Sequence, residues 1–132
     1  MDKVIFFITL EQLLTIHEDQ IDRYGGSHGI RDLNLLESAL FRPQSTFSGE
    51  DLYKTIFDKA AALLHSLVLN HPFVDGNKRT AAVSVIMFLS LNGWVIKVSQ
   101  KELVKTLLDI EAKRFTIPGL SNWLKSNSIS MN

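Results

Sequence analysis

Side chains that can do chemistry are concentrated in residues 70–80, which read NHPFVDGNKRT. This stretch holds an imidazole, a carboxylate, amides and two cations around a glycine. Apolar residues at helical spacing lead into it and out of it: Ala60, Leu63, Leu64, Leu67 and Val68 before, and Ala81, Val83, Val85, Ile86, Phe88 and Leu89 after. The pattern predicts a short polar loop between two core helices, with the last residues of the stretch beginning the second helix.

The start of this second helix is a predicted phosphate-binding site, formed by Gly76, Asn77, Lys78 and Arg79. The first backbone N–H groups of a helix have no partner within the helix, and the helix dipole adds partial positive charge there. Gly76 allows the backbone to turn these N–H groups toward one point. Lys78 and Arg79 add full positive charges, so the segment is suited to bind an anion such as phosphate.

Neighbouring residues have roles that fit a phosphate site. Pro72 disfavours helical geometry at His71, so we expect His71 to leave the first helix and project from the loop. An imidazole near a phosphate is suited to act as general base for a hydroxyl nucleophile. Asp75 supplies one carboxylate, which suits a magnesium ion shared with substrate phosphates. Phe73 is predicted to point inward and anchor the loop.

Each of these residues also has a common structural role, since Gly-Asn is usually a turn and a Lys-Arg pair is usually solvated. Their combination in this order favours a site. The stretch is not a Walker A loop, because Lys78 is followed by Arg79 and the required upstream glycine is missing. A metal triad of His65, His71 and Asp75 is not favoured, because their spacing puts no two of them on one helix face.

Residues 71–79, HPFVDGNKR, resemble the signature of the Fic/Doc superfamily, and the lysine at position 78 resembles the Doc branch, the death-on-curing toxins. The motif is long and ordered, so the match is specific. The resemblance covers nearly the whole chain and includes IH at 16–17, YGG at 24–26, GIRD at 29–32, LLESAL at 35–40, FL at 88–89 and NG at 92–93.

This resemblance implies a transferase that uses ATP as donor and a protein hydroxyl as acceptor. It implies His71 as the base, Asp75 as the Mg²⁺ ligand, and residues 76–78 as the phosphate cradle. Arg79 would stabilise charge that develops in the transition state. The Doc branch implies a Ser/Thr kinase acting on translation elongation factor Tu, and a prevent-host-death-type antitoxin that folds onto the toxin and masks it.

Other functions remain as alternatives. A Fic-type protein adenylyltransferase is disfavoured, because the usual Fic motif has glycine at the position of Lys78 and a second arginine at the position of Ala82. A non-enzymatic phosphate- or nucleotide-binding module is disfavoured by His71, because a binder needs no base. A regulator that binds nucleic acid directly is disfavoured by the charge balance, since Lys plus Arg and Asp plus Glu are 14 each.

Composition limits the organisation of the chain. Its 132 residues predict a single Fic/Doc-like domain over residues 1–132. The absence of cysteine excludes disulfides and thiolate metal sites. No apolar run approaches the roughly 20 residues of a membrane helix, and no targeting segment stands out, so we expect a cytoplasmic protein with no membrane partner.

The first half of the chain has the following predicted elements. Residues 3–8 form a short strand or an extended lead-in, and a helix capped by Thr9 and Gln12 covers about residues 10–24. The glycine-rich segment 25–31 is either a plain connection or, as the resemblance implies, a substrate flap in which His28 and Arg31 are candidate contacts. Asp32 begins a helix over 33–41, with inward-facing Leu33, Leu36 and Leu40.

The remaining elements are centred on the motif. Phe47 anchors a loop over 42–50, and a capping box of Ser48 and Asp51 begins a central helix over about 51–69. The motif helix runs to about Leu91. Residues 94–98 are extended and either pair with residues 3–8 or cross the bundle. A capping box of Ser99 and Glu102 begins a helix that runs to about Lys113. Its apolar stripe is Leu103, Val104, Leu107 and Leu108, with Glu111 outermost. A last helix covers about 118–125, before a frayed end at 126–132.

The fold class that follows is all-α, a compact bundle of about six helices with minor extended segments. The central helix and the motif helix form its core pair.

Overall fold

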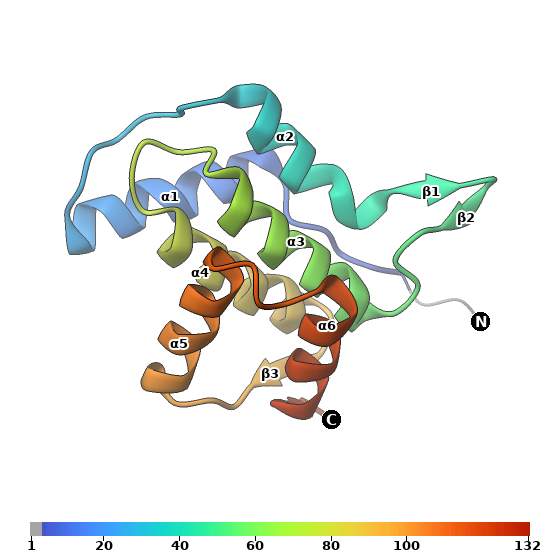
Figure 1. Ribbon diagram of the computed structural model, residues 1–132. Coiled ribbons are helices and arrows are strands. Elements are labelled where there is room, and N and C mark those ends of the chain that lie inside the picture. Colours follow the sequence, from blue (N-terminus) through green and yellow to red (C-terminus); the bar gives the residue numbers. More distant parts are fainter. Residues whose placement is uncertain (1–3) are drawn as a thin grey trace.

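The computed structural model describes residues 4–132 (Figure 1). Its helices within this range are α1 Leu10–Tyr24, α2 Leu33–Phe41, α3 Ile56–Asn70, α4 Asn77–Leu91, α5 Gln100–Glu111 and α6 Ile117–Ser126. The strands are β1 Thr46–Phe47, β2 Glu50–Asp51, β3 Trp94–Ile96 and β4 Ser128–Ser130, and a 3₁₀ turn covers Arg42–Gln44. The predicted all-α class is confirmed. None of the helices in the described part of the chain has the length and apolar character needed to cross a membrane.

Helix α3 is the centre of the structure and packs against α2, α4, α5 and α6 (Figure 1). Nearly its whole surface is buried, and three consecutive alanines, Ala60, Ala61 and Ala62, allow neighbouring helices to approach closely. Helix α4 lies beside α3 and adds Ala81, Val85, Phe88 and Leu89 to the same core. The predicted core pair is therefore confirmed, and the loop between these two helices is held by the most buried part of the molecule.

Several predicted helix boundaries are confirmed by their caps. Thr9 and Gln12 form a complete capping box at the start of α1. Asp32 accepts a hydrogen bond from the N–H of Leu35 and caps α2. Ser99 caps α5 by accepting from the N–H of Glu102. These local signals could be found in the sequence because each joins residues only three positions apart.

The predicted start of the central helix was wrong. Ser48 and Asp51 do not cap it, because residues 46–51 form an antiparallel hairpin that projects from the body (Figure 1). Ser48 and Gly49 both have positive φ, at 51° and 79°, which is the geometry of a tight hairpin turn. The complete capping box that begins α3 is instead Thr55 with Asp58.

Residues of this hairpin region also differ from prediction. Phe47 is 75% exposed and anchors nothing, and Leu52 is exposed as well. The anchor is Lys59, which is fully buried on α3. Its ammonium group contacts the carboxylate of Asp51 at 3.1 Å and donates to the carbonyl oxygen of Tyr53. A buried ammonium needs such partners, so these polar groups replace the predicted apolar anchor.

The two chain ends compare differently with prediction. The extended lead-in, one of two forms predicted for residues 3–8, is confirmed over its described part, whereas the predicted fraying of residues 126–132 is wrong. Residues 4–9 are extended but form no strand; residue 3 of the predicted segment lies outside the described residues. The side chain of Asn92 holds this lead-in by bonding both the N–H and the carbonyl oxygen of Phe6. Strand β3 pairs with β4 rather than with the N-terminal segment. The segment 126–132 is therefore partly an ordered strand instead of a frayed end.

The buried faces of α2 and α5 are narrower than predicted. Leu33, Val104 and Leu108 are exposed. Helix α5 buries Thr106, Leu107 and Ile110, a stripe displaced around the helix from the predicted one. Its contacts with other helices are mainly with α3, and Val104 and Leu108 lie on a face that the described residues leave exposed. Helix α5 ends at Glu111, before the predicted Lys113, and α6 extends one residue beyond each predicted end.

Candidate active site

The loop between α3 and α4 carries the predicted base. His71 is the residue that follows α3, and it has a left-handed backbone conformation with φ 45° and ψ 55°. Pro72 after it disfavours helical geometry, so the chain leaves the helix here, as predicted. A left-handed backbone costs free energy for any residue other than glycine, so the surrounding structure must hold His71 in this conformation. The side chain of His71 is 45% exposed and accessible to a substrate.

The side chain of Asn77 fixes the loop from the start of α4. Its Oδ1 accepts from the N–H of Phe73 at 2.9 Å, and its Nδ2 donates to the carbonyl oxygen of Phe73 at 3.0 Å. Nδ2 also lies 3.5 Å from Nδ1 of His71. The amide of Asn77 is buried and occupied by the loop backbone, so any phosphate contact that this residue makes uses its backbone N–H.

Phe73 points inward, as predicted, and stacks on His17 of α1. The two rings lie 3.7 Å apart with an angle of 6° between their planes. Nε2 of His17 donates to the carbonyl oxygen of Asp75 at 2.8 Å. Burial lowers the pKa of His17 below its ordinary value of 6.5, so the ring is held neutral against the loop. No role was predicted for His17, because it lies on a different helix from the motif and no local pattern links the two.

The glycine-rich segment before α2 runs alongside the motif loop. The N–H groups of Arg31 and Asp32 both donate to the carbonyl oxygen of Pro72, and the N–H of Val74 donates to that of Gly29. The guanidinium of Arg31 donates to the carbonyl oxygens of His71 at 2.6 Å and Asn70 at 2.8 Å.

The two candidate flap residues therefore differ in their surroundings. Arg31 caps the end of α3, and its two observed side-chain contacts are with the protein's own backbone. His28 is exposed and lies 3.0 Å from the carboxylate of Asp22. Among the described residues, His28 has no polar contact with the motif.

Gly76 precedes α4 with φ 75°, a conformation that favours glycine. A Cβ atom built there would lie 2.9 Å from Cδ1 of Ile21 and 3.4 Å from the guanidinium of Arg79. The tight space and the left-handed backbone together explain why the motif needs glycine. The N–H groups that follow it at the start of α4 are those predicted to face a phosphate.

Lys78 and His71 meet at a residue that sequence reasoning missed. Oε2 of Glu111, the last residue of α5, lies 2.9 Å from Nζ of Lys78 and 3.5 Å from Nε2 of His71. The hydrogen bond from Lys78, and then the charges of Lys78 and His71, lower the pKa of Glu111. Glu111 was predicted as the outermost residue of an apolar stripe, and no local pattern links it to Lys78, 33 residues away.

Arg79 points to a different neighbour. Its guanidinium donates to the carbonyl oxygens of Gln20 at 3.3 Å and Gly25 at 2.9 Å, at the end of α1, and lies 5.7 Å from the centre of the Tyr24 ring. A cation is favourable at the negative end of a helix. Within residues 4–132, no polar contact joins Arg79 to the cluster of His71, Lys78 and Glu111.

Asp75 is the predicted metal ligand. Its Oδ2 accepts from the N–H of Ser27 at 2.8 Å, whereas no hydrogen bond within the described residues engages Oδ1. Residues 4–132 contain no group of three acidic, histidine or cysteine side chains that could hold a metal ion on their own. A single available carboxylate oxygen nevertheless fits Mg²⁺, which commonly takes one or two protein carboxylates and completes its shell with phosphates and water.

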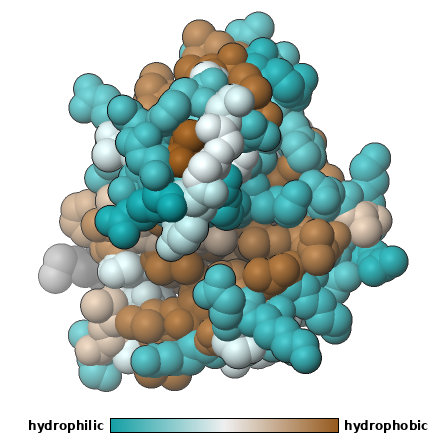
Figure 2. Space-filling view, turned by 90° about the vertical axis from the view of Figure 1, so that its left-hand side faces the viewer, coloured by the Kyte–Doolittle hydropathy of each residue, from teal (hydrophilic) through white to brown (hydrophobic). Residues whose placement is uncertain are grey.

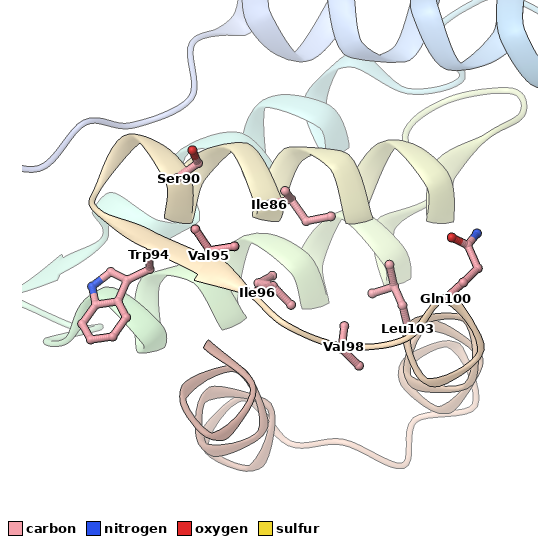
Figure 3. Close-up of a pocket in the computed structure, with 8 residues that line it drawn as sticks. All are labelled: Ile86, Ser90, Trp94, Val95, Ile96, Val98, Gln100 and Leu103. Carbon is pink, nitrogen blue, oxygen red and sulfur yellow. The ribbon is translucent and has the colours of Figure 1, made fainter. Parts of the chain in front are cut away.

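A separate pocket lies away from this loop, between α4, β3 and the start of α5 (Figure 3). Its lining is mostly apolar and includes Ile86, Trp94, Ile96 and Leu103, with Ser90 and Gln100 as polar members. It contains no residue of the motif. The motif residues therefore lie on the loop between α3 and α4 and outside this pocket.

Comparison with known proteins gives the following matches. Residues 7–89 match the model of the Fic/DOC family. The protein named Toxin Doc from Mycolicibacterium smegmatis is 53% identical over 70 residues, which are 53% of this chain and 54% of that protein. Protein kinase doc from Escherichia phage P1 is 36% identical over 86 residues, which are 65% of this chain and 68% of that protein. The chain thus spans about half the length of the first relative and about two thirds of the second.

Proposed function

The chain belongs to the Fic/DOC family, on its Doc branch, and from this premise we propose that it is a Doc-like toxin that phosphorylates a protein. It transfers the γ-phosphate of ATP to a serine or threonine hydroxyl. The observation that supports this best is the juxtaposition of His71, a base on an exposed loop, with Lys78 at the first turn of α4. The names of the two relatives, a toxin and a protein kinase, support the same class of function.

In the proposed reaction His71 is the general base. A ring nitrogen takes the proton of the acceptor hydroxyl while the hydroxyl oxygen forms a bond to the γ-phosphorus. The bond between the γ-phosphorus and the oxygen that bridges it to the β-phosphate breaks, and ADP leaves. The left-handed backbone at His71 aims the ring away from α3 toward the start of α4, where the phosphates bind.

The phosphates bind at the first turn of α4. The backbone N–H groups after Gly76, including that of Asn77, face the anion, and Lys78 supplies a mobile cation. Arg79 is held over the end of α1 and adds positive charge from that position. Its proposed role is to stabilise the charge that develops on the transferred phosphate.

Asp75 is the proposed ligand for Mg²⁺ through Oδ1. The ion supplies charge neutralisation for the phosphates when it is bound. The neighbouring bond from Ser27 to Oδ2 orients this carboxylate, and the bond from His17 to the Asp75 carbonyl fixes the backbone. The carboxylate is thereby held beside the start of α4.

Transfer of phosphate rather than AMP follows from two positions on α4. Lys78 crowds the place where Fic enzymes have glycine. Ala82 cannot supply the second guanidinium that holds the distal phosphates in those enzymes. Lys78 and Arg79 can neutralise the terminal charge of the γ-phosphate, which makes that phosphorus the better centre for attack.

The family suggests translation elongation factor Tu as the acceptor protein and a prevent-host-death-type antitoxin as the partner. Exposed apolar side chains support a partner that covers part of the surface, and they include Ile30, Val74, Val104 and Leu108. Figure 2 shows apolar surface gathered in a band across one face of the molecule. A target of this kind places the proposed reaction in the cytoplasm.

The test offers ATP labelled on the α-phosphate and ATP labelled on the γ-phosphate, separately, with purified elongation factor Tu and Mg²⁺. Label on the acceptor from the γ position alone is the expected result. Label on the acceptor from the α position would overturn the kinase proposal and support a protein adenylyltransferase. If the protein binds ATP but transfers no label to this acceptor or to whole-cell protein, the result would support a non-enzymatic nucleotide-binding module.

A further inference from the structure

A single carboxylate oxygen contacts both side chains that the proposed reaction uses. Oε2 of Glu111 lies 2.9 Å from Nζ of Lys78 and 3.5 Å from Nε2 of His71. The three side chains are 34%, 38% and 45% exposed, respectively, so they form a cluster at the surface rather than a buried structural tie. Because Glu111 is the last residue of α5, a helix from another part of the chain completes the motif loop.

The contact with Lys78 has a consequence for phosphate binding. Glu111 is ionised at neutral pH, as a carboxyl is at its ordinary pKa, and at 2.9 Å it neutralises the cation that phosphate needs. A phosphate oxygen and Oε2 of Glu111 are both anionic acceptors for the same ammonium group. ATP that binds through Lys78 must therefore displace Glu111 from the ammonium group. Breaking this ion pair lowers the affinity for ATP.

The contact with His71 has the opposite consequence for the transfer step. When His71 takes the proton of the acceptor hydroxyl, the ring becomes an imidazolium with N–H at both nitrogens. Nε2 then carries a proton and faces the carboxylate, whichever nitrogen received the new one. A negative charge at 3.5 Å stabilises this imidazolium more than it stabilises the neutral ring.

We propose that Glu111 is a positioning residue that exchanges partners during the reaction, neutralising Lys78 before ATP binds and the imidazolium of His71 during transfer. It lowers the affinity for ATP and raises the rate of transfer. This inference rests on the proposed function, because it assumes that Lys78 binds phosphate and that His71 accepts a proton.

The substitution Glu111→Gln tests both effects, since it keeps the size of the side chain and removes its charge. Calorimetry with ATP and Mg²⁺ should show binding about two- to fivefold tighter, the range expected for releasing a partly exposed ion pair. The kcat for transfer should fall about tenfold, a part of the general-base contribution. A purely structural role of Glu111 predicts weaker binding instead, because Lys78 would lose its support.

A double-mutant cycle with Lys78→Gln shows whether the affinity change goes through Lys78. In the Lys78→Gln background, Glu111→Gln should no longer tighten ATP binding, because there is no ammonium group to release. The control is Glu102→Gln, which removes an exposed carboxylate from the other end of α5 and should change neither quantity. If Glu111→Gln still tightens ATP binding in the Lys78→Gln background, the proposed exchange of partners is overturned.

The outcomes separate this inference from the proposed function. Transfer with unchanged or raised kcat in Glu111→Gln overturns the inference and leaves the kinase intact. Binding that becomes weaker in this variant overturns it as well. If the wild-type protein transfers no phosphate, the proposed function fails, and the predicted effect of Glu111 on the rate of transfer fails with it. The change in ATP affinity that depends on Lys78 then decides by itself whether Glu111 competes with phosphate.

Discussion

The guanidinium of Arg31 donates a 2.6 Å hydrogen bond to the backbone carbonyl oxygen of His71. A second bond, 2.8 Å long, goes to the carbonyl oxygen of Asn70. These two carbonyls lie at the end of α3, where they have no partner within the helix, and the helix dipole is negative there. Arg31 thus stabilises the turn in which His71 is held with positive φ.

Replacing Arg31 by Ala should lower the free energy of unfolding by about 1 kcal/mol, because charged hydrogen bonds at an exposed position are lost. It should also slow transfer by about tenfold or more, because the base is less well positioned. Urea unfolding and initial rates measure the two effects. Arg23→Ala is the control, since it removes an exposed ion pair with Asp19 and should change the free energy of unfolding little. Full activity in Arg31→Ala would show that the loop holds His71 without it.

Activity and stability should favour different residues at position 71, because transfer needs the imidazole whereas the left-handed backbone favours glycine. Both His71→Ala and His71→Gly should reduce transfer by roughly 10²–10⁴-fold through loss of the base. The glycine variant should be more stable than the alanine variant by about 1 kcal/mol, since glycine adopts φ 45° without strain. Chemical unfolding and transfer assays on both variants provide the comparison. Near wild-type transfer in either variant would exclude His71 as the base.

Gly76→Ala should weaken ATP binding as well as stability. The new Cβ would meet Ile21 at 2.9 Å on a backbone with φ 75°, so the first turn of α4 must shift. We expect a loss of about 1–2 kcal/mol in the free energy of unfolding from the left-handed alanine. The matched control is Gly93→Ala, which has φ 89° and nothing within 4 Å of the new atom. Calorimetry should find that only the Gly76 variant loses ATP affinity; equal affinity in both would place the phosphates elsewhere.

Asp75 should make transfer dependent on Mg²⁺. A chelator should abolish transfer by the wild-type protein, and Asp75→Asn should raise the Mg²⁺ concentration needed for half-maximal rate, because an amide binds the ion less strongly than a carboxylate. The substitution keeps an oxygen that can accept from the N–H of Ser27. Rates measured over a series of Mg²⁺ concentrations provide the readout. An unchanged Mg²⁺ requirement would make Asp75 a turn residue only.

Stability should fall as the pH is lowered through the range of the buried histidines. Burial lowers the pKa of His17, so the unfolded chain binds a proton near pH 6.5 while the folded protein does not. The stabilising contribution is present above this pH and is lost as the pH falls toward the folded value, at a rate of at most about 1.4 kcal/mol per pH unit. His65 contributes with the same sign, also through burial.

Urea unfolding between about pH 7.5 and 5.5 measures this dependence. His17→Gln keeps a donor for the Asp75 carbonyl but cannot titrate, so its stability should change less over this range than that of the wild-type protein. His28→Gln is the control, because it removes an exposed histidine that lies outside the motif loop. An identical pH dependence in His17→Gln and the wild-type protein would contradict the assignment.

The sequence by itself determined the features that depend on short segments. The caps at Thr9, Asp32 and Ser99 join residues three apart, and apolar periodicity located the core pair α3 and α4. The loop between them was predictable because Pro72 and Gly76 restrict the backbone locally. The exit of His71 from the helix and the inward position of Phe73 followed from the same few residues, as did the family resemblance carried by residues 71–79. The left-handed backbone of His71 was not predicted.

Only the tertiary structure decided which distant groups surround this loop. Arg31 contacts His71 from 40 residues away, and Glu111 contacts Lys78 from 33 residues away. Arg79, predicted to act at the phosphate site, donates hydrogen bonds to backbone carbonyl oxygens at the end of α1, 54 residues away in the case of Gly25. The pairing of β3 with β4 was likewise decided between separated segments. A charged side chain on a helix surface could pair with several other groups. Which of these groups lies beside it depends on how the other helices pack against α3. Local sequence patterns contain no information on that choice, because the free energy that decides it comes from the burial of the whole core.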